Sequence, residues 1–386
     1  MQREIYLDNS ATTRPYDAVI DYINDINRET YGNASSLHTK GIEAEKIIKA
    51  ARQKIADTMK VDSKEIIFTS GGTESNNLAI LGYLEANPRK GKHIITSSIE
   101  HPSVLEVFKY LQGKGYKVDF INVNQEGIIQ IEELRQKITK ETALISIMLV
   151  NNEIGSIQPL EDIVRARNEL NREAVLHVDA VQAYGKIAIL PKKSGIEMLT
   201  VSSHKIHGPK GVGALYVDKN IRIKPVLHGG GQESLLRSGT ENVPGIGGFG
   251  MSAEMIHISR EESYQRMENL RNLFIDSLNK RLDRFTIISP EHALPYILNI
   301  SFGDLRSEVL LHHLEEKGIF VSTGSACSSR KSIHSHVLKA IGIKSCDIEG
   351  AIRFSFSAFN TEQEIIDTVE TMKEIVPKIS VTRKGR

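Results

Sequence analysis

The sequence has little that would suggest an exported, membrane-bound or nucleic-acid-binding protein. Its 386 residues include 2 cysteines, Cys327 and Cys346, which cannot build a disulfide framework. No apolar run approaches the roughly 18 residues that a membrane-spanning helix needs, and the N-terminus lacks the apolar core of a secretory signal. Lysine and arginine number 49 against 48 aspartates and glutamates, so no basic excess marks a nucleic-acid surface. These absences predict a soluble protein of a reducing compartment, and we expect it in the cytoplasm.

Several ligand-binding motifs are also missing or misplaced. The phosphate loop G-x-x-x-x-G-K-[ST] does not occur, which excludes a P-loop nucleotide binder. Gly245–Gly250 fits the dinucleotide pattern G-x-G-x-x-G, but it follows Pro244 rather than a strand, so small residues that let a helix pack closely are the better interpretation. The adjacent histidines 312–313 cannot face one ligand, and neither His334 nor His336 has further ligands at metal spacing. We therefore predict no metal site.

From residue 65 onward the chain alternates short apolar runs with segments of helix length. With 40% hydrophobic residues there is enough apolar material for a large core. The candidate strands are Glu65–Phe68, His93–Thr96, Tyr116–Val123, Ala143–Leu149, Ala174–Val178, Met198–Val201 and Ala214–Val217. Short runs rich in branched residues and separated by helices are typical of a sheet that is covered on both faces. The sequence predicts an α/β fold with a mostly parallel seven-stranded sheet.

A second alternation of strands and helices follows a long helical segment that ends near Leu282. It predicts strands at 295–301, 320–322 and 351–355, and helices at 306–316, 336–341 and 362–376. We therefore expect a large domain over 14–255 and a smaller α/β domain over 256–386. The N-terminal segment 1–13, with a short strand at Ile5–Leu7, is expected to associate with the small domain.

One polar stretch at the end of an apolar run contains a lysine. The run Met198–Val201 predicts a buried strand, Lys205 follows it among histidines and small polar residues, and a Gly/Pro turn leads to Ala214–Val217. A lysine that is partly desolvated has a lowered pKa, and its amine can form Schiff bases with carbonyl compounds. A lysine on a surface turn is the alternative interpretation of this stretch taken alone.

Two further stretches favour the chemical interpretation of Lys205. The strand Ala174–Val178 delivers Asp179 to a strand end, and Thr69–Asn77 is a Gly/Ser/Thr turn that leads into a helix starting near Glu74. Backbone amides at a helix start bind phosphate. A lysine for an aldehyde, an aspartate for a pyridinium nitrogen and an amide-rich loop for a phosphate are the three groups that hold pyridoxal 5'-phosphate.

With these residues in place, the chain resembles a known family almost end to end: the cysteine desulfurases of the NifS-like and IscS-like kind. They belong to the class V aminotransferases, pyridoxal phosphate enzymes of the aspartate-aminotransferase-like fold, also called fold type I. The resemblance is carried by Leu7–Thr13, Tyr31–His38, Thr69–Asn77, Glu100–Val104, Val150–Gly155, His177–Gln182, Val201–Gly213, Arg237–Thr240, Gly324–Ser329 and Ile352–Ser355. This resemblance implies the same fold, cofactor and reaction class here.

The resemblance implies a set of cofactor residues: Gly72, Thr73, His101, Asn152, Asp179, Gln182, Ser202, His204, Lys205 and Thr240. Lys205 would carry the cofactor covalently and Asp179 would keep its ring nitrogen protonated. His101 would stack on the ring and carry protons, for which a flat imidazole that titrates near neutrality is suited. From its loop alone, His101 could also be a solvated histidine.

The remaining implied cofactor residues contact the ring oxygen or the phosphate. Asn152 and Gln182 would hydrogen-bond the phenolic oxygen, while Ser202 and His204 would bind the phosphate alongside Thr73. Thr240 would reach the phosphate of the neighbouring subunit, which implies a homodimer.

Two residues are implied to bind the substrate carboxylate. Arg353 would fix it by a bidentate contact, with Asn33 assisting. From its Gly/Asn/Ser loop alone, Asn33 could simply permit a tight turn.

Cys327 lies in a stretch of small polar residues, Ser322 to Ser332. A cysteine kept for packing would lie on an apolar face, whereas Arg330 and Lys331 close behind this one favour a partly exposed thiolate. An incidental loop cysteine is the alternative from the stretch alone. By resemblance Cys327 is the nucleophile, and Cys346 has no matching role in the family.

The reaction implied by the resemblance converts L-cysteine to L-alanine and leaves the sulfur on Cys327 as a persulfide. Lys205 would remove the Cα proton. The sulfur would pass to an acceptor protein, an iron–sulfur scaffold or a tRNA-thiolation enzyme. The sequence departs from the usual family pattern at Ser332-Ile333-His334, where a Leu-Glu-Pro run is common, and this departure affects which acceptor could dock there.

Three other functions share parts of this pattern. A selenocysteine lyase or an aminotransferase would have the same fold and most of the cofactor residues, but Cys327 in its short polar loop argues against a simple aminotransferase. A non-enzymatic scaffold would be expected to have lost Lys205 or Cys327, and both are present.

Overall fold

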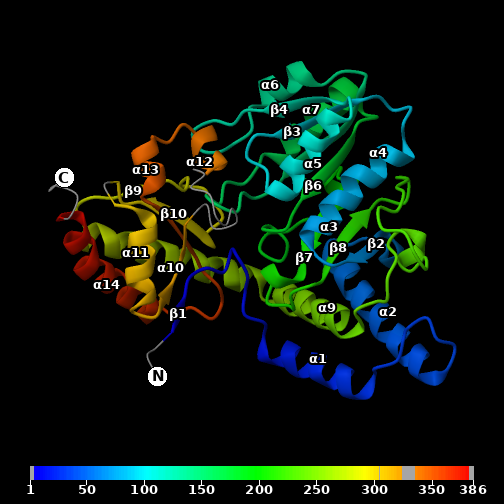
Figure 1. Cartoon of the computed structure of the whole chain (residues 1–386), viewed down its shortest axis with the longest axis horizontal. Coiled ribbons are helices and arrows are strands. Elements are labelled where there is room, and N and C mark those ends of the chain that lie inside the picture. Colours follow the sequence, from blue (N-terminus) through cyan, green and yellow to red (C-terminus); the bar gives the residue numbers. More distant parts are fainter. Residues whose placement is uncertain (1–3, 304, 324–334, 382–386) are drawn as a thin grey trace.

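The computed structural model of this chain describes residues 4–303, 305–323 and 335–381. Figure 1 shows two lobes, one built around a large sheet and the other around a smaller sheet, with the N-terminal segment running between them. Cys327 and the rest of the stretch 324–334 lie outside the described residues, so the interpretation of this cysteine rests on the sequence.

The large lobe contains a seven-stranded sheet in the order β2-β8-β7-β6-β5-β3-β4. Its strands are β2 (Ile66–Thr69), β3 (His93–Ser97), β4 (Lys117–Ile121), β5 (Thr142–Met148), β6 (Val175–Asp179), β7 (Met198–Ser202) and β8 (Gly213–Val217). Neighbouring strands from β4 to β7 are parallel, and β8 is antiparallel to both β7 and β2. The predicted mostly parallel sheet is confirmed, and each predicted strand overlaps an observed one.

Adjacent residues of the central strands enter different cores, because side chains alternate across a sheet. Ile94 and Leu144 pack in one cluster with residues of the helical run 78–84 and of α5 (Pro102–Gly113). Their neighbours Ile95 and Ile145 pack in a different cluster, with residues of the helices α2 (Thr39–Met59), α7 (Leu160–Asn171) and α9 (Val243–Ile258). Since helices cover both faces, every residue of β5 is buried, which explains the continuous apolar runs in the sequence.

The helices of the large lobe begin and end as follows: α1 (Asp17–Glu29), α2 (Thr39–Met59), α3 (Gly72–Asn77), α4 (Tyr83–Ala86), α6 (Ile131–Lys137), α7 (Leu160–Asn171), α8 (Pro191–Ser194) and α9 (Val243–Ile258). The Gly-rich segment that fits the dinucleotide pattern lies inside α9. A side chain at Gly250 would bring its Cβ to 2.6 Å from the Ala51 Cα in α2. Small residues therefore let α9 and α2 approach closely, as the sequence suggested.

The small lobe contains a four-stranded sheet in the order β12-β13-β10-β9. Its strands are β9 (Thr286–Ile287), β10 (Ile297–Ser301), β12 (Ser322–Thr323) and β13 (Ala351–Ser355), and its helices are α10 (Arg260–Arg281), α11 (Ser307–Glu315), α12 (His336–Ala340), α13 (Ser345–Glu349) and α14 (Glu362–Val381). All the pairings in this sheet are antiparallel. The predicted alternation after Leu282 is present, with β9 and α13 as further elements.

The N-terminal segment joins the small lobe before it reaches the large one. Strand β1 (Ile5–Tyr6) pairs in parallel with β11 (Ile319–Phe320), and Asp8 bridges Ser355. The expected domain boundary at residue 255 stays a prediction, although α9 packs on α2 and α10 packs on α14. Among the described residues, none of the helices combines the length and apolar character needed to cross a membrane.

Candidate active site

Polar side chains follow the carboxyl ends of neighbouring parallel strands. Asp179 is the last residue of β6 and Ser202 the last of β7, and Asn152 follows β5. His101 comes four residues after the end of β3, and Lys205 ends the short 3₁₀ helix η3 (Ser203–Lys205) that continues β7. The carboxyl ends of parallel strands share one edge of a sheet, where α/β proteins bind their ligands. The sheet therefore brings five of the predicted site residues to this edge.

Lys205 is held by the N-terminal segment. Its Nζ donates to the carbonyl oxygen of Ser10 at 2.5 Å and to that of Ala11 at 2.7 Å. The Ser10 oxygen also accepts from Gln182 Nε2 at 2.9 Å. One backbone carbonyl thus links the predicted cofactor lysine to the glutamine predicted to bind the cofactor ring.

Asp179 is buried and accepts a hydrogen bond on each of its two carboxylate oxygens. Its Oδ1 accepts from the Val181 amide at 3.0 Å, and its Oδ2 accepts from Asn76 Nδ2 at 2.8 Å. Asn76 Nδ2 also donates to Ser103 Oγ at 2.8 Å, and Ser103 Oγ lies 2.8 Å from His101 Nδ1. Because the Ser103 amide also donates to His101 Nδ1, this nitrogen is an acceptor and the ring proton is on Nε2. A chain of hydrogen bonds therefore connects the aspartate to the histidine.

The environment of His101 keeps its ring neutral. Burial lowers the pKa of His101, the Asp179 charge opposes this, and the charges of Lys205 and His336 add to the lowering. As the N-cap of α5, His101 is fixed where the chain turns from the strand edge into a helix. A neutral imidazole with a defined tautomer can both accept and donate a proton.

The structure fits a phosphate-bearing cofactor between β7 and the start of α3. The hydroxyl of Ser202 is buried and has no hydrogen-bond partner among the described residues. Buried hydroxyls are nearly always hydrogen-bonded, so this one indicates a missing partner. A Cβ on Gly72 would lie 2.8 Å from Val181, so the start of α3 lies directly against the residues that follow Asp179. The backbone amides at the start of α3, the Ser202 hydroxyl and Asp179 thus lie close together.

His204 also lies in this region. Burial lowers its pKa to about 3, with further lowering from the charges of Lys205, Lys210 and Lys186, and its Nδ1 is 3.2 Å from Thr12 Oγ1. His204 is therefore a neutral hydrogen-bonding group. Thr73 is exposed in the first turn of α3.

Arg353, in β13, faces the same region from the small lobe. Its Nη2 is 2.7 Å from Asp8 Oδ1, and its Nη1 donates to the Asn152 carbonyl oxygen at 2.9 Å. Its Nε is buried and has no acceptor among the described residues. The side chain is therefore fixed by two partners and retains a donor for an anionic ligand such as a carboxylate.

Two predicted site residues lie on exposed loops instead. Asn33 precedes α2, and its Oδ1 accepts from the Ser35 amide at 2.9 Å, which is the local turn contact that its sequence also allowed. Thr240 is exposed on the loop before α9. That loop is tied to α3 by Arg237, whose Nε is 2.8 Å from Glu74 Oε1.

Several residues of this site were not identified from the sequence: Ser10, Asn76, Ser103 and Lys186. Asn76 and Ser103 lie inside motifs quoted for the resemblance, but their contacts depend on how α3 and α5 pack together. Ser10 acts through its backbone carbonyl oxygen, which every residue type has, so its identity in the sequence does not reveal this role. Lys186 has no sequence signal that separates it from a surface lysine.

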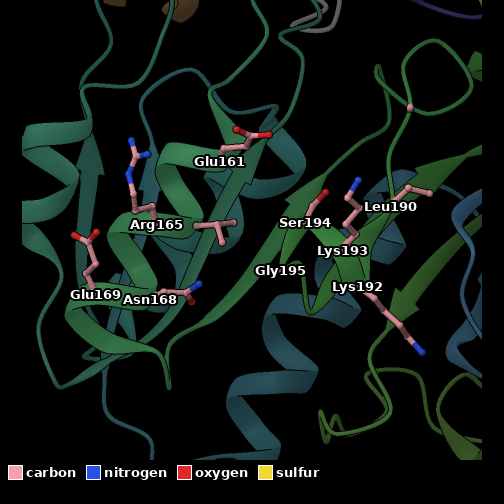
Figure 2. A pocket seen from close by; sticks show the side chains of 11 residues that line it. Glu161, Arg165, Asn168, Glu169, Leu190, Lys192, Lys193, Ser194 and Gly195 are labelled. Carbon is pink, nitrogen blue, oxygen red and sulfur yellow. The ribbon is translucent and has the colours of Figure 1, made fainter.

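A large cavity of the molecule lies elsewhere. It measures about 780 Å³ and is lined by residues of α7 and of the segment 188–195, including Arg165, Glu169 and Lys193 (Figure 2). Because α8 immediately precedes β7, this cavity is at the amino ends of the strands, opposite the edge with Lys205. In the parts of the chain that are described, no cluster of His, Cys, Asp or Glu could hold a metal ion.

Comparisons with known proteins agree with this geometry. The family model Aminotransferase class-V matches residues 5–367. A cysteine desulfurase IscS of Dictyoglomus turgidum is 41% identical over 380 residues, which cover 98% of this chain and 96% of the relative. A solved NifS-like protein matches with a TM-score of 0.92 at 41% identity, over 97% of this chain and 100% of that chain. A structure described as SspA in complex with cysteine has a TM-score of 0.82 at 34% identity, over 92% of this chain and 100% of that chain.

Proposed function

Since this chain belongs to the aminotransferase class-V family, we propose that it is a pyridoxal-phosphate-dependent cysteine desulfurase, which converts L-cysteine to L-alanine and passes the sulfur to a protein acceptor. The observation that carries the proposal is the strand edge with Lys205 and Asp179, in a chain similar over nearly its whole length to a cysteine desulfurase. A solved relative at 34% identity is described in complex with cysteine, which supports this substrate.

The residues that would hold the cofactor come from the strand edge. Lys205 would bind its aldehyde carbon, Asp179 its ring nitrogen, and Asn152 and Gln182 its phenolic oxygen. Gly72, Thr73, Ser202 and His204 would surround its phosphate, which is supported by the buried hydroxyl of Ser202. When bound, pyridoxal phosphate withdraws electrons from the substrate's Cα and so acidifies the Cα proton.

The chain's own residues would then position the substrate and move protons. Arg353 binds the substrate carboxylate, which its fixed orientation between Asp8 and Asn152 supports. Lys205 Nζ takes the Cα proton. His101, neutral and with its proton on Nε2, donates and accepts protons at the strand edge.

Sulfur transfer is assigned to Cys327, on the sequence alone. Its thiolate attacks the substrate's sulfur, so that an S–S bond forms while the Cβ–S bond breaks. The electron pair released at Cβ takes up a proton to give the methyl group of alanine, and Cys327 is left as a persulfide. The atoms balance as one L-cysteine and one thiol giving one L-alanine and one persulfide.

The deciding experiment separates cofactor chemistry from sulfur transfer. Cys327→Ser should still bind L-cysteine and change the visible absorbance of the bound cofactor, while alanine and sulfide formation falls to background. Wild-type protein treated briefly with L-cysteine should gain the mass of one sulfur on the peptide that contains Cys327. Cys346→Ser is the matched control, because Cys346 is exposed and should be nearly silent. Desulfuration by Cys327→Ser at the wild-type rate would show that sulfur leaves without this thiol.

The oligomeric state is a further part of the proposed function. We propose a homodimer in which Thr240 completes the partner's site. Exposed apolar side chains on two loops support this, with Leu37 at 97% and Leu235 at 71% exposure. Light scattering should report a dimer that Leu235→Asp weakens, whereas Val309→Asp on α11 should not weaken it. An active monomer at micromolar concentration would contradict the shared site.

We propose a cytoplasmic sulfur acceptor, an iron–sulfur scaffold or a tRNA-thiolation enzyme, because a reducing compartment keeps the Cys327 thiol free between sulfur transfers. Capture of proteins that receive labelled sulfur from the Cys327 persulfide tests this assignment. Labelled sulfur that passes only to small thiols would contradict a protein acceptor.

A further inference from the structure

Lys186 is a buried lysine next to the candidate site. It lies in the turn that follows β6 and is 5% exposed. Its Nζ donates to Gln182 Oε1 at 3.2 Å and lies 5.4 Å from the centre of the Tyr296 ring. Neither of these partners carries a negative charge. Burial of an ammonium group that has no acidic partner among the described residues is costly, so stability does not explain this position.

The charged and titratable groups around Lys186 are mainly cationic or neutral. Burial lowers the pKa of Lys186 to about 7, and the charges of Lys205 and Arg353 add to the lowering. In return, the Lys186 charge lowers the pKa values of His204 and His207. The charge of Lys186 therefore interacts with the titratable groups at the strand edge that holds Lys205.

The contact with Lys186 determines which way the Gln182 amide points. A glutamine amide has an oxygen that accepts and a nitrogen that donates, and the two ends can exchange places by a rotation of the amide group. Below its pKa of about 7, Lys186 is an ammonium that can only donate, so it selects the oxygen. Gln182 Nε2 must then face the other way, where it donates to the Ser10 carbonyl oxygen at 2.9 Å. That carbonyl also accepts from Lys205 Nζ.

We propose that Lys186 is a positioning residue that fixes the amide of Gln182, so that Gln182 Nε2 rather than Oε1 faces the Ser10 carbonyl and the strand edge. Nε2 carries two hydrogens, of which the Ser10 oxygen takes one. The second is a donor for an oxygen of the bound ligand. If the amide turned round, Oε1 would face the Ser10 oxygen, two acceptors would meet, and the ligand would lose its donor.

This inference rests on the proposed function, because the ligand at the edge is pyridoxal phosphate. The test uses the protein reconstituted with pyridoxal phosphate and measures the visible absorption maximum and the cofactor dissociation constant. Lys186→Met keeps the length of the side chain but removes the donor. It should shift the absorption maximum in the same direction as Gln182→Ala and weaken cofactor binding roughly tenfold, the effect of losing one hydrogen bond.

The double variant distinguishes positioning from a general structural effect. Because Lys186 acts through Gln182, Lys186→Met combined with Gln182→Ala should have the same absorption maximum as Gln182→Ala alone. Shifts that add would overturn the proposal, as would a wild-type spectrum for Lys186→Met. Lys186→Arg retains a cationic donor and should preserve the wild-type spectrum.

Two controls keep the test interpretable. Gln182→Glu leaves Lys186 paired but presents only acceptor oxygens to the Ser10 carbonyl, so it should also shift the absorption maximum. An unchanged absorption maximum in this variant would overturn the proposal, even if Lys186→Met did not fold. Urea unfolding of the apo-protein should show Lys186→Met to be at least as stable as the wild type, since an uncompensated buried charge is removed. Failure of the wild type to form a visible band that borohydride removes would instead refute the proposed function.

Discussion

Asp8 and Arg353 form an ion pair, with Asp8 Oδ1 2.7 Å from Arg353 Nη2, that joins the N-terminal segment to the central part of the small sheet. The Arg353 side chain is 7% exposed and that of Asp8 is 20% exposed. The guanidinium is therefore oriented before any substrate arrives. Ordering a charged side chain in advance reduces the entropy that binding would otherwise cost.

The first prediction concerns this pre-orientation. Asp8→Ala should raise KM for L-cysteine roughly tenfold or more, because a hydrogen bond to a charged group contributes about 1.5–3 kcal/mol. The turnover number should change less, because Asp8 does not touch the reacting atoms in the proposed mechanism. Steady-state kinetics measure both values. Asp17→Ala, which removes the exposed partner of Arg14, is the matched control and should leave both unchanged. A loss confined to kcat would contradict the role assigned to Asp8.

The second prediction concerns Asn76, which is completely buried and donates to both Asp179 and Ser103. Asn76→Ala leaves a carboxylate oxygen and a hydroxyl without this donor, so the apo-protein should lose about 1–3 kcal/mol of stability. Binding of pyridoxal phosphate should also weaken, since Asp179 loses one of the groups that orient it. Urea unfolding and cofactor titration measure the two effects.

Asn87→Ala is the control for Asn76→Ala. Asn87 also donates two amide hydrogens, to the carbonyl oxygens of Tyr83 and Arg222, but it lies at the C-terminal end of α4. Its substitution should leave cofactor binding unchanged. If Asn76→Ala lost stability while its cofactor affinity stayed at the wild-type value, Asn76 would be a packing residue only.

The sequence predicts the sheet well because each strand is a short apolar run between helix-length segments, and it predicts Asp179 and Lys205 at strand ends for the same local reason. The residues that orient them could not be predicted in this way. Asn76 and Ser103 meet only because α3 packs beside α5, and Lys205 is held by backbone oxygens of a segment nearly 200 positions away. Such contacts depend on tertiary packing and have no period or composition in the sequence. Helix α1, which packs on α9, is different: the sequence interpretation did not include it, although Val19, Ile23 and Ile26 recur at helical spacing.

The third prediction is a pH dependence caused by Glu100. Burial raises the pKa of Glu100 from 4.5 to about 8, the Asp179 charge adds to the increase, and hydrogen bonds from Ser97 and the Met148 amide oppose it. Between these two pH values the folded protein therefore holds a proton that the unfolded chain has released. This contribution to stability is fully present below pH 4.5 and is lost as the pH rises towards 8.

Glu100→Gln should remove this loss of stability with rising pH, because the amide is neutral at every pH. The unfolding free energy of the variant minus that of the wild type should increase from pH 5 to pH 8 by on the order of 1.4 kcal/mol per pH unit. Urea unfolding at several pH values measures it, with the exposed Glu132→Gln as the control. A difference that stays constant across this range would show that Glu100 is ionised in the folded protein.

The fourth prediction concerns the ion pair that anchors the loop before α9. Arg52 contacts both carboxylate oxygens of Glu233 at 2.7 Å, and Glu233 is the first of three consecutive residues with positive φ, 233–235. Arg52→Met leaves the Glu233 charge buried without its partner and should cost about 3–5 kcal/mol of stability. Chemical unfolding measures this cost.

A second substitution tests the cause of that loss. Glu233→Gln combined with Arg52→Met removes the unpaired charge while keeping an acceptor for the Phe68 amide, so it should recover more than half of the stability. Lys54→Met, in an exposed pair with Glu254, should cost less than about 1 kcal/mol. No recovery in the double variant would show that packing rather than charge causes the loss.

The pairing of β1 with β11 has a consequence for biosynthesis. Strand β1 is synthesised long before its partner β11 at 319–320, and Asp8 long before its bridge partner Ser355. All strands of the large sheet lie between residues 66 and 217, so that sheet can assemble while the rest is still being translated. Ser10 and Ala11 can take their final places beside Lys205 only when β11 and β13 have been added. A truncated product that ends before β11 can therefore build the large sheet and still lack the fixed lysine, so we expect activity only in products that include β11 and β13.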